Sequence, residues 1–121
     1  GYGDPVVTKG LNMLYGPGND LVSATAMTAA GAHLILFSTG RGTPFSAPAP
    51  TLKISTNTPL AEKKASWIDF NTGVIADGEK TIDEAAKDLL DLVIRVAGGE
   101  QTKAEKHGFR EISIFKDGVV L

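Results

Sequence analysis

One arginine stands between two glycines in a loop that directly follows an apolar run. The loop reads Phe37-Ser-Thr-Gly-Arg-Gly-Thr-Pro-Phe45, and the run before it reads Ala32-His-Leu-Ile-Leu36. The guanidinium of Arg41 offers a planar fork of donors for a carboxylate or a phosphate, and the glycines let the backbone approach a ligand closely. The loop therefore predicts a site for a small anion. The alternative is a turn whose arginine meets only solvent or a structural carboxylate, because an isolated Gly-Arg-Gly is a weak motif.

Local sequence patterns predict the elements that carry this loop. Three short runs of apolar and β-branched residues favour strands. These strands are expected at residues 11–15, 32–37 and 51–55. An alanine-rich helix over residues 21–30 separates the first two, with Asn19 or Asp20 as N-cap and Gly31 as C-cap. Strand, helix and strand in this order predict a right-handed βαβ unit with parallel strands.

Two further helices are predicted in the second half of the chain. Thr58 is the expected N-cap of a short helix, with Pro59 at its first position and Lys64 near its end. Thr81 and Glu84 have the spacing of a capping box. Apolar residues then recur at helical spacing until two glycines end the pattern, so this helix has the stronger local signals.

Alternation of apolar and polar residues predicts two more strands, at residues 67–71 and 110–115. The charged residues 103–108 are expected to form a surface connection, and Asp117-Gly118 to offer the turn of a terminal hairpin. These elements predict the α/β class. We expect a three-layer, Rossmann-like variant with a mostly parallel sheet and helices on both faces, folded as a single domain over residues 1–121.

Three loops follow the carboxyl ends of the predicted parallel strands, where α/β sheets bind ligands. They span residues 16–20, 38–44 and 55–58, and they share one rim if the strands are neighbours. Hydroxyls and amides beside a guanidinium fit a hydroxylated acid, since hydroxyls need mixed donors and acceptors while a carboxylate needs a cationic fork. The side chains on this rim are Asn19, Asp20, Ser38, Thr39, Arg41, Thr43 and Asn57, with Lys53 near a strand end.

Each of these residues also has a purely structural interpretation. In this interpretation Asp20 is merely a helix cap, and Asn19 and Asn57 are merely turn residues. Lys53 can simply project from an edge strand. Asp69 is a candidate base or metal ligand, but an aspartate on the open face of a strand is more often solvated. The two histidines, His33 and His107, are expected to be structural or exposed.

Composition excludes several classes of function. Twelve basic and fourteen acidic residues give a net charge of −2, so neither nucleic acid nor a membrane is an expected partner. The chain has no cysteine, which agrees with a cytoplasmic protein and leaves no self-contained zinc site. Neither a dinucleotide fingerprint nor a phosphate loop is present. The chain opens at Gly1 rather than at a methionine, so we expect a fragment of a longer protein.

Five blocks in order along the chain resemble the carboxyl-terminal part of the altronate and galactarate dehydratases. The blocks are Gly10-Leu-Asn-Met-Leu-Tyr-Gly-Pro-Gly-Asn-Asp20, Phe37-Ser-Thr-Gly-Arg-Gly-Thr-Pro-Phe45, Lys53-Ile-Ser-Thr-Asn57, Trp67-Ile-Asp-Phe-Asn71 and Arg110-Glu-Ile-Ser-Ile-Phe115. The family loop usually reads Thr-Thr-Gly-Arg-Gly and often has a glycine after the phenylalanine. Ser38 and Ser46 stand in those two places here, so the first hydroxyl is kept and the glycine after Phe45 is absent.

The resemblance implies the last part of a cytoplasmic hydro-lyase that dehydrates sugar acids, assisted by a divalent metal such as Fe²⁺. The metal ligands are not identifiable in this chain. The remaining domains of the parent enzyme are expected partners, the isolated fragment is expected to be inactive, and assembly into a homo-oligomer stays open. Altronate is preferred over galactarate only by overall likeness.

The resemblance also suggests roles for single residues in a dehydration that stabilises an enediolate. Arg41 is the expected carboxylate clamp, the Thr39 and Thr43 hydroxyls orient the substrate, and Asn57 reads a hydroxyl. Lys53 and Asp69 are the candidate catalytic residues for the general base, which can also lie outside this chain. The full expected substrate-binding set is Gly16, Gly18, Asn19, Ser38, Thr39, Gly40, Arg41, Gly42, Thr43 and Asn57. The rival hypotheses are a non-catalytic packing or assembly module and a stand-alone binding protein for small molecules.

Overall fold

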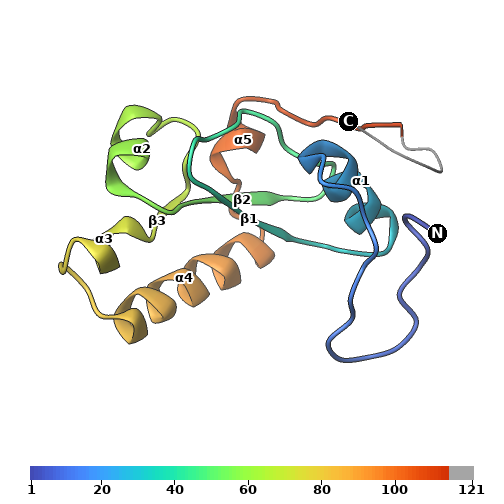
Figure 1. The fold of residues 1–121 in the computed structure, drawn as a ribbon, viewed down its shortest axis with the longest axis horizontal. Coiled ribbons are helices and arrows are strands. Elements are labelled where there is room, and N and C mark those ends of the chain that lie inside the picture. The colour runs from blue at the N-terminus through green and yellow to red at the C-terminus, as the bar shows by residue number, and fades with distance from the viewer. Residues whose placement is uncertain (115–121) are drawn as a thin grey trace.

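Three parallel strands form the sheet in the computed structural model, which describes residues 1–114. The strands lie in the order of the sequence: β1 (Ile35–Thr39), β2 (Thr51–Ser55) and β3 (Phe70–Asn71). The helices are α1 (Asp20–Ala29), α2 (Thr58–Lys63), α3 (Gly73–Ala76), α4 (Ile82–Ala97) and α5 (Lys103–Lys106). Figure 1 shows α4 on one side of the strands and α1 and α5 on the other. The predicted α/β class with a parallel sheet is confirmed.

The register gives the sheet two different faces. Phe37 of β1 pairs with Lys53 of β2, so their side chains lie on the same face of the sheet. Side chains alternate along a strand, so Ile35 also lies on this face, which we call the α1 face. Ile35 and Phe37 belong there to the same hydrophobic cluster as Leu21 and Ala24 of α1. The core on this face consists of Ala24, Ile35, Phe45, Ala47 and Ala49, with Leu21, Met27 and Phe37 packed against it.

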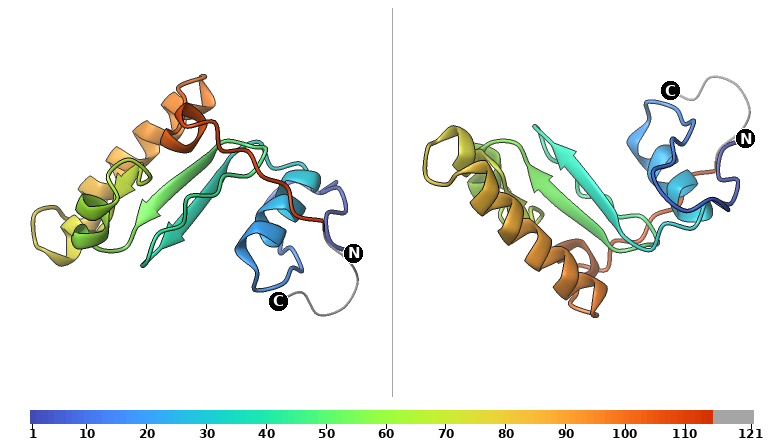
Figure 2. Two further views of the ribbon diagram at one scale, coloured as in Figure 1. Left: turned by 90° about the horizontal axis from the view of Figure 1, so that it is seen from above. Right: turned by 90° about the horizontal axis from the view of Figure 1, so that it is seen from below.

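The opposite side, which we call the α4 face, carries Leu36, Leu52 and Ile54. Leu52 is 0% and Ile54 8% exposed, whereas Leu36 of β1 is 50% exposed. Figure 2 shows the sheet between α1 and α4. The α4 face is therefore well covered over β2 and poorly covered over β1.

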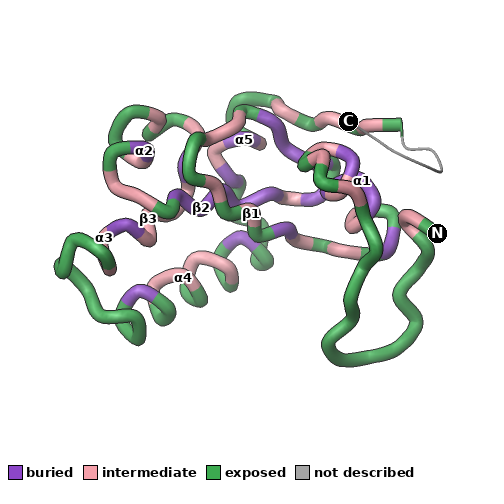
Figure 3. The backbone as a smooth tube through the Cα atoms, in the orientation of Figure 1, coloured by how far each residue is buried: buried purple, intermediate pink, exposed green. Residues whose placement is uncertain are grey.

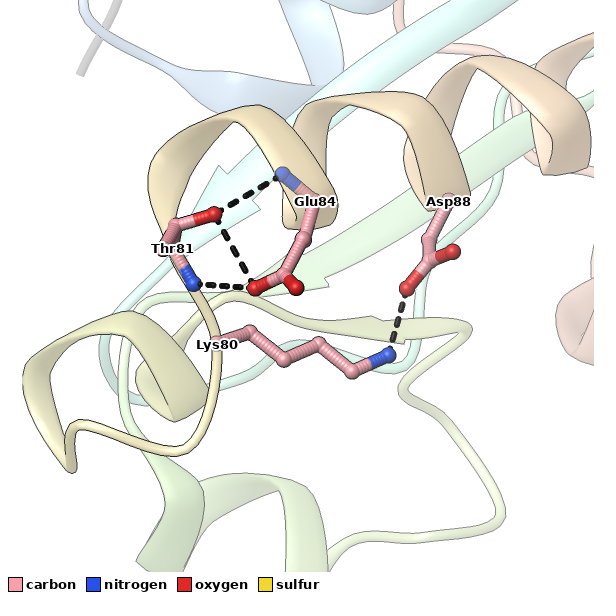
Figure 4. A network of polar contacts seen from close by, with 4 residues as sticks. All are labelled: Lys80, Thr81, Glu84 and Asp88. Atoms are coloured by element: carbon pink, nitrogen blue, oxygen red, sulfur yellow. Dashed lines mark hydrogen bonds and ion pairs between the residues drawn. The ribbon is translucent and has the colours of Figure 1, made fainter.

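The capping box at the start of α4 is present as predicted. The Thr81 N–H donates to Glu84 Oε2 at 2.8 Å, and the Glu84 N–H donates to Thr81 Oγ1 at 3.2 Å. Figure 4 shows both bonds, and beside them the ion pair between Lys80 and Asp88. Two N–H groups that have no partner within the helix are thus satisfied by side chains.

Replacing Thr81 with alanine is expected to destabilise the domain by about 1 kcal/mol, because the variant loses the N-cap bond. Urea unfolding measures this loss. Lys80→Ala, in the position before Thr81, is the matched control. Lys80 and its ion-pair partner Asp88 are both exposed, so this substitution is expected to change stability by less than about 0.5 kcal/mol. Equal effects of the two substitutions would contradict a specific role for the cap.

The predicted strand at residues 11–15 is wrong. This segment is irregular, and Leu11, Met13 and Tyr15 are 96%, 92% and 81% exposed. Figure 3 shows the amino-terminal stretch as an exposed arm outside the buried sheet and α1. A strand exists only when a neighbour satisfies its backbone groups, and no strand of the described chain lies beside this segment, so the predicted βαβ unit around α1 is absent as well.

The remaining boundaries differ by smaller amounts. The strand predicted at residues 51–55 is confirmed in full, and the one predicted at 32–37 is shifted to Ile35–Thr39. Of residues 67–71 only Phe70–Asn71 is strand, because the chain turns just before it: the Trp67 N–H donates to the Lys64 carbonyl at 2.8 Å.

Residues 103–108 were expected to form a surface connection, and this prediction is confirmed only for the exposed residues 106–108. Lys103–Lys106 forms α5, where Ala104 and the cap residue Thr102 are buried. Residues 110–114 form no strand, because the Glu111 N–H donates to the Ser46 carbonyl of a loop rather than to a neighbouring strand. Phe115 and the predicted hairpin lie outside the described residues. Within residues 1–114, no helix combines the length and the apolar character that crossing a membrane requires.

Candidate functional site

Two of the three predicted loops are joined directly at the carboxyl ends of β1 and β2. The Thr56 N–H donates to the Thr39 carbonyl at 3.1 Å, and the Asn57 side-chain amide donates to the Gly40 carbonyl, also at 3.1 Å. The residues in register at this edge, Thr39 and Ser55, place both loops at the same level. The loops 38–44 and 55–58 therefore form one surface, as the parallel arrangement predicted.

The glycine after the arginine has a conformation that other residues rarely adopt. Gly42 has φ +81°, and its N–H donates to Thr39 Oγ1 at 2.9 Å. A Cβ at Gly42 would lie 3.0 Å from Lys64 Cδ and 3.1 Å from Leu60 Cδ1. A side chain at this position would be strained by the backbone and crowded by α2 and the residue after it.

Close packing at Gly42 brings a second cation next to the arginine loop. The Lys64 amine lies 3.6 Å from the place that a Gly42 Cβ would take, and it lies over the Trp67 ring at 4.6 Å from the centroid. The aromatic ring attracts the ammonium without neutralising it. Lys64 is a candidate binding residue that sequence reasoning missed, because no local motif links it to Arg41.

Arg41 itself is exposed, and among residues 1–114 its guanidinium forms no ion pair. Ser38 and Gly40 beside it are also exposed, while Thr43 is half-buried. The fork of Arg41 is therefore open to an anion from solvent. The fork is thus available for the two-point bond that a carboxylate clamp makes, and its use by a substrate stays a prediction.

Asn57 joins the two loops and caps α2. Its Oδ1 accepts from the Leu60 N–H at 2.9 Å while its Nδ2 donates to the Gly40 carbonyl. Asn57, rather than the predicted Thr58, is thus the N-cap of α2. Both ends of the amide hold the loops together, so Asn57 shapes the site; its predicted reading of a substrate hydroxyl is untested.

The third predicted loop, residues 16–20, is tied to α1. Asn19 Oδ1 accepts from the Val22 N–H at 3.1 Å and caps the helix, and Ser23 Oγ donates to the Pro17 carbonyl. A Cβ at Gly16 would lie 3.4 Å from the Ser23 Oγ atom, whereas a Cβ at Gly18 would have no neighbouring atom within 4 Å. Figure 2 shows α1 toward one side of the sheet and α2 toward the other. Gly16, Gly18 and Asn19 stay predicted substrate contacts.

Lys53 is a buried amine and not a side chain of an edge strand. β2 is the central strand, and Lys53 has 0% exposed surface. Among the buried side-chain nitrogen and oxygen atoms of the described residues, its Nζ is the one without a hydrogen-bond partner. This Nζ lies 5.7 Å from the centre of the Phe45 ring. Burial lowers the pKa of the amine from 10.5 to about 8, while the Asp69 and Glu111 carboxylates act in the opposite direction. A substrate cannot reach this amine in the arrangement seen here.

Asp69 is engaged by backbone on both oxygens. Oδ2 accepts from the Lys53 N–H at 2.8 Å, and Oδ1 accepts from the Lys103 N–H at 2.9 Å. The carboxylate therefore ties β2 to the first turn of α5, so Asp69 is more than a solvated side chain, although it is only partly buried and lines a pocket of about 300 Å³. Its role as a general base stays a prediction.

The residues described here do not fit a metal ion. Within residues 1–114, no group of three or more histidine, aspartate or glutamate side chains comes together, and both His33 and His107 are exposed. The orphaned buried atom is an amine, which at neutral pH repels a metal rather than binding it. The expected Fe²⁺ would need ligands from elsewhere.

Comparisons with known proteins point to one family. The family model described as D-galactarate/altronate dehydratase, C-terminal, matches residues 1–120. Altronate dehydratase of Escherichia coli (strain K12) is 48% identical over 120 residues, which are 99% of this chain and 24% of that protein. The altronate dehydratase of Bacillus subtilis (strain 168) is 46% identical over 120 residues, again 99% of this chain and 24% of that protein. Galactarate dehydratase (L-threo-forming) of Escherichia coli (strain K12) is 35% identical over 93% of this chain and 22% of that protein.

The chain spans about a quarter of the length of the curated relatives that it matches. Since the family model covers nearly all of its residues, this chain belongs to the D-galactarate/altronate dehydratase family and corresponds to the C-terminal part of those enzymes.

Proposed function

We propose that this chain is the carboxyl-terminal domain of a hydro-lyase that removes water from altronate. The observation that supports this proposal most strongly is the higher identity to two altronate dehydratases than to galactarate dehydratase. Galactarate is the second candidate substrate because a member of the same family carries that name. Both acids offer a carboxylate beside a chain of hydroxyls.

The reaction is a β-elimination next to a carboxylate. A base takes the proton from the carbon beside the carboxylate, the bond to the hydroxyl on the next carbon breaks, and an acid protonates the departing oxygen so that water leaves. Negative charge accumulates on the carboxylate as the enediolate forms, so groups that bind those oxygens stabilise the transition state more than the ground state.

In our proposal Arg41 binds the substrate carboxylate through its two parallel N–H donors. Its exposure, the glycines on either side and the nearby Lys64 ammonium support this role. The Ser38, Thr39 and Thr43 hydroxyls then lie within the same loop to orient substrate hydroxyls. Thr39 Oγ1 accepts the Gly42 N–H, which leaves its own O–H free to donate to a ligand.

Neither candidate for the general base is a free group at the surface: Lys53 is fully buried, and Asp69, which lines a pocket of about 300 Å³, accepts a backbone N–H on each carboxylate oxygen. A pKa of about 8 would suit Lys53 for proton transfer near neutral pH, but the amine is fully buried. For Lys53 to act as a base, the cover that includes Phe45 would have to open. We therefore propose that the base and the ligands of a divalent metal, with Fe²⁺ as the expected ion, come from the remaining part of the parent enzyme.

The rival proposal is that this domain serves only for packing and assembly within that enzyme. The buried Lys53 and the structural hydrogen bonds of Asn57 and Asp69 favour it. The substitution of Arg41 separates the two proposals, as argued in the Discussion.

The substrate is tested with the complete native enzyme, assayed with added Fe²⁺ under reducing conditions on altronate and galactarate side by side. We expect kcat/KM on altronate to exceed that on galactarate at least about 10-fold, a difference of about 1.4 kcal/mol in transition-state binding. If the enzyme prefers galactarate, galactarate replaces altronate as the proposed substrate. If it turns over neither acid, the proposed reaction is refuted.

A further inference from the structure

The apolar side chains of α4, the longest helix, extend beyond the part of the helix that the sheet covers. Ala85 and Val96 of α4 are buried at 2% and 5% exposure, whereas Leu90 and Ile94 are 57% and 60% exposed. Exposed Ala86 and Ala97 lie on the same flank as these two, since successive residues turn by about 100° around a helix. The charged residues Asp83 and Lys87 share this flank in the first half of the helix, whereas from Leu90 to Ala97 it carries apolar side chains, where an ordinary amphipathic helix in water would place polar ones.

A pocket on the other flank shows which way this apolar flank points. It has a volume of about 300 Å³ and is lined by Asp69 and by Phe70 of β3 together with Asp88, Asp91, Leu92 and Arg95 of α4. The polar flank of α4 therefore faces the β3 side of the sheet. The flank with Leu90 and Ile94 must face the opposite way, toward β1.

β1 offers a matching apolar side chain. It is an edge strand in the order β1-β2-β3, and its Leu36 on the α4 face is 50% exposed while Leu52 on the same face is 0% exposed. The view from below in Figure 2 shows α4 lying along the sheet with β1 left uncovered beside it. The apolar flank of α4 and Leu36 thus belong to one exposed apolar surface beside the edge strand, to which we give the name α4–β1 groove; it consists of Leu36, Ala86, Leu90, Ile94 and Ala97.

The position of the groove fits a helix. Helices that cover a parallel sheet lie side by side at about 8–10 Å, and parallel sheets are normally covered on both faces. On the α4 face only the position over β2 and β3 is filled by a helix of the described residues. The position over β1 is bordered by a helix on one side and by a half-exposed leucine beneath.

We propose that the α4–β1 groove is the docking site of an amphipathic helix from the part of the parent polypeptide outside this domain. The relatives that this chain matches over 99% of its length are about four times as long, so the parent chain has the material to supply this helix. Its apolar residues, at i, i+3, i+4 and i+7, would bury Leu36, Leu90 and Ile94. The inference rests on the proposal that this chain is one domain of a longer enzyme, but not on any catalytic role of Arg41.

Cysteine labelling tests the occupancy of the groove directly, since the chain has no cysteine of its own. Leu90→Cys and Ile94→Cys are introduced singly into the complete enzyme, and Asp91→Cys on the exposed polar flank of the same helix is the matched control. Maleimide labelling is followed by mass spectrometry of the tryptic peptide that runs from Asp88 to Arg95 and contains all three positions. We expect Leu90→Cys and Ile94→Cys to label at least about 10-fold more slowly than Asp91→Cys.

Labelling of all three positions at the same rate would overturn the proposal. Protection that disappears on dilution of the enzyme would also overturn it, because a second copy would then occupy the groove. If one variant fails to fold, the other still decides the question. The readout is independent of turnover, so an inactive enzyme with protected cysteines would refute the proposed function and support the docking site.

Discussion

Replacing Arg41 with alanine in the complete enzyme is expected to lower kcat/KM on altronate about 100-fold and to leave the fold unchanged. A charge-assisted, two-point bond to a carboxylate contributes about 1.5–3 kcal/mol, and 2.7 kcal/mol corresponds to a factor of about 100. Arg41 is exposed and forms no ion pair with residues 1–114, so its removal takes away no packing. Steady-state kinetics and thermal unfolding measure the two effects.

Two further variants make the result specific. Arg41→Lys keeps the charge but loses the planar fork, so we expect it to recover only part of the activity, about 10-fold below the wild type. Arg110→Ala removes another exposed arginine of this chain and is expected to behave as the wild type. Unchanged kinetics in Arg41→Ala would refute the carboxylate clamp and favour the packing module.

The elements that sequence reasoning placed correctly carry their signals locally. The box of Thr81 and Glu84 lies within one turn of helix, and the helix after it follows as predicted. The strand Thr51–Ser55 was also placed with the correct bounds. In both cases a short stretch of chain contains the caps or the alternation that the element needs.

The errors concern elements that depend on distant partners. Residues 11–15 have the composition of a strand, but nothing in that composition shows whether a neighbouring strand exists. The surroundings of Lys53 were misjudged for the same reason, because strand order decides whether β2 is central or at an edge. Neither property is written in a window of five residues.

One error was avoidable. Thr102 and Glu105 have the same spacing as the capping box of α4, and they form a second box at the start of α5. The surrounding charges hid this pattern, so the segment was interpreted as a surface connection. The buried Thr102 shows that a cap can face the core even in a charged stretch.

The candidate site divides in the same way. The glycine–arginine loop and its contact with the loop at Asn57 follow from two parallel strands in register, which the sequence indicated. Lys64 approaches Gly42 only through the packing of the chain after β2. The backbone bonds of Asp69 depend on α5, 34 residues later in the chain, so no local pattern could have predicted them.

The buried amine of Lys53 leads to the prediction with the largest expected effect on stability. The pKa of this amine falls from 10.5 to about 8 in the folded chain because burial disfavours the charged form. At pH 7 folding therefore keeps a poorly solvated ammonium, whose Nζ has no hydrogen-bond partner among the described residues. Methionine has a similar shape and no charge, so Lys53→Met is expected to stabilise the domain at pH 7 by about 2–3 kcal/mol.

The pH dependence follows from the direction of the shift. Between about pH 8 and 10.5 the unfolded chain binds the proton of Lys53 and the folded chain does not, so the stability of the wild type rises with pH through this window. Below pH 8 both states are protonated, and the penalty is constant. The advantage of Lys53→Met should therefore be largest below pH 8 and shrink steadily up to pH 10.5.

Urea unfolding of the chain at several pH values, followed by the fluorescence of its single tryptophan, Trp67, measures this difference. Lys9→Met replaces an exposed lysine of the amino-terminal arm and is expected to change stability by less than about 0.5 kcal/mol at every pH. A Lys53→Met variant that is less stable than the wild type at pH 7, with a difference that does not change up to pH 10.5, would mean that the ammonium is paired. The amine would then be a structural cation, and its lowered pKa could no longer support a role in proton transfer.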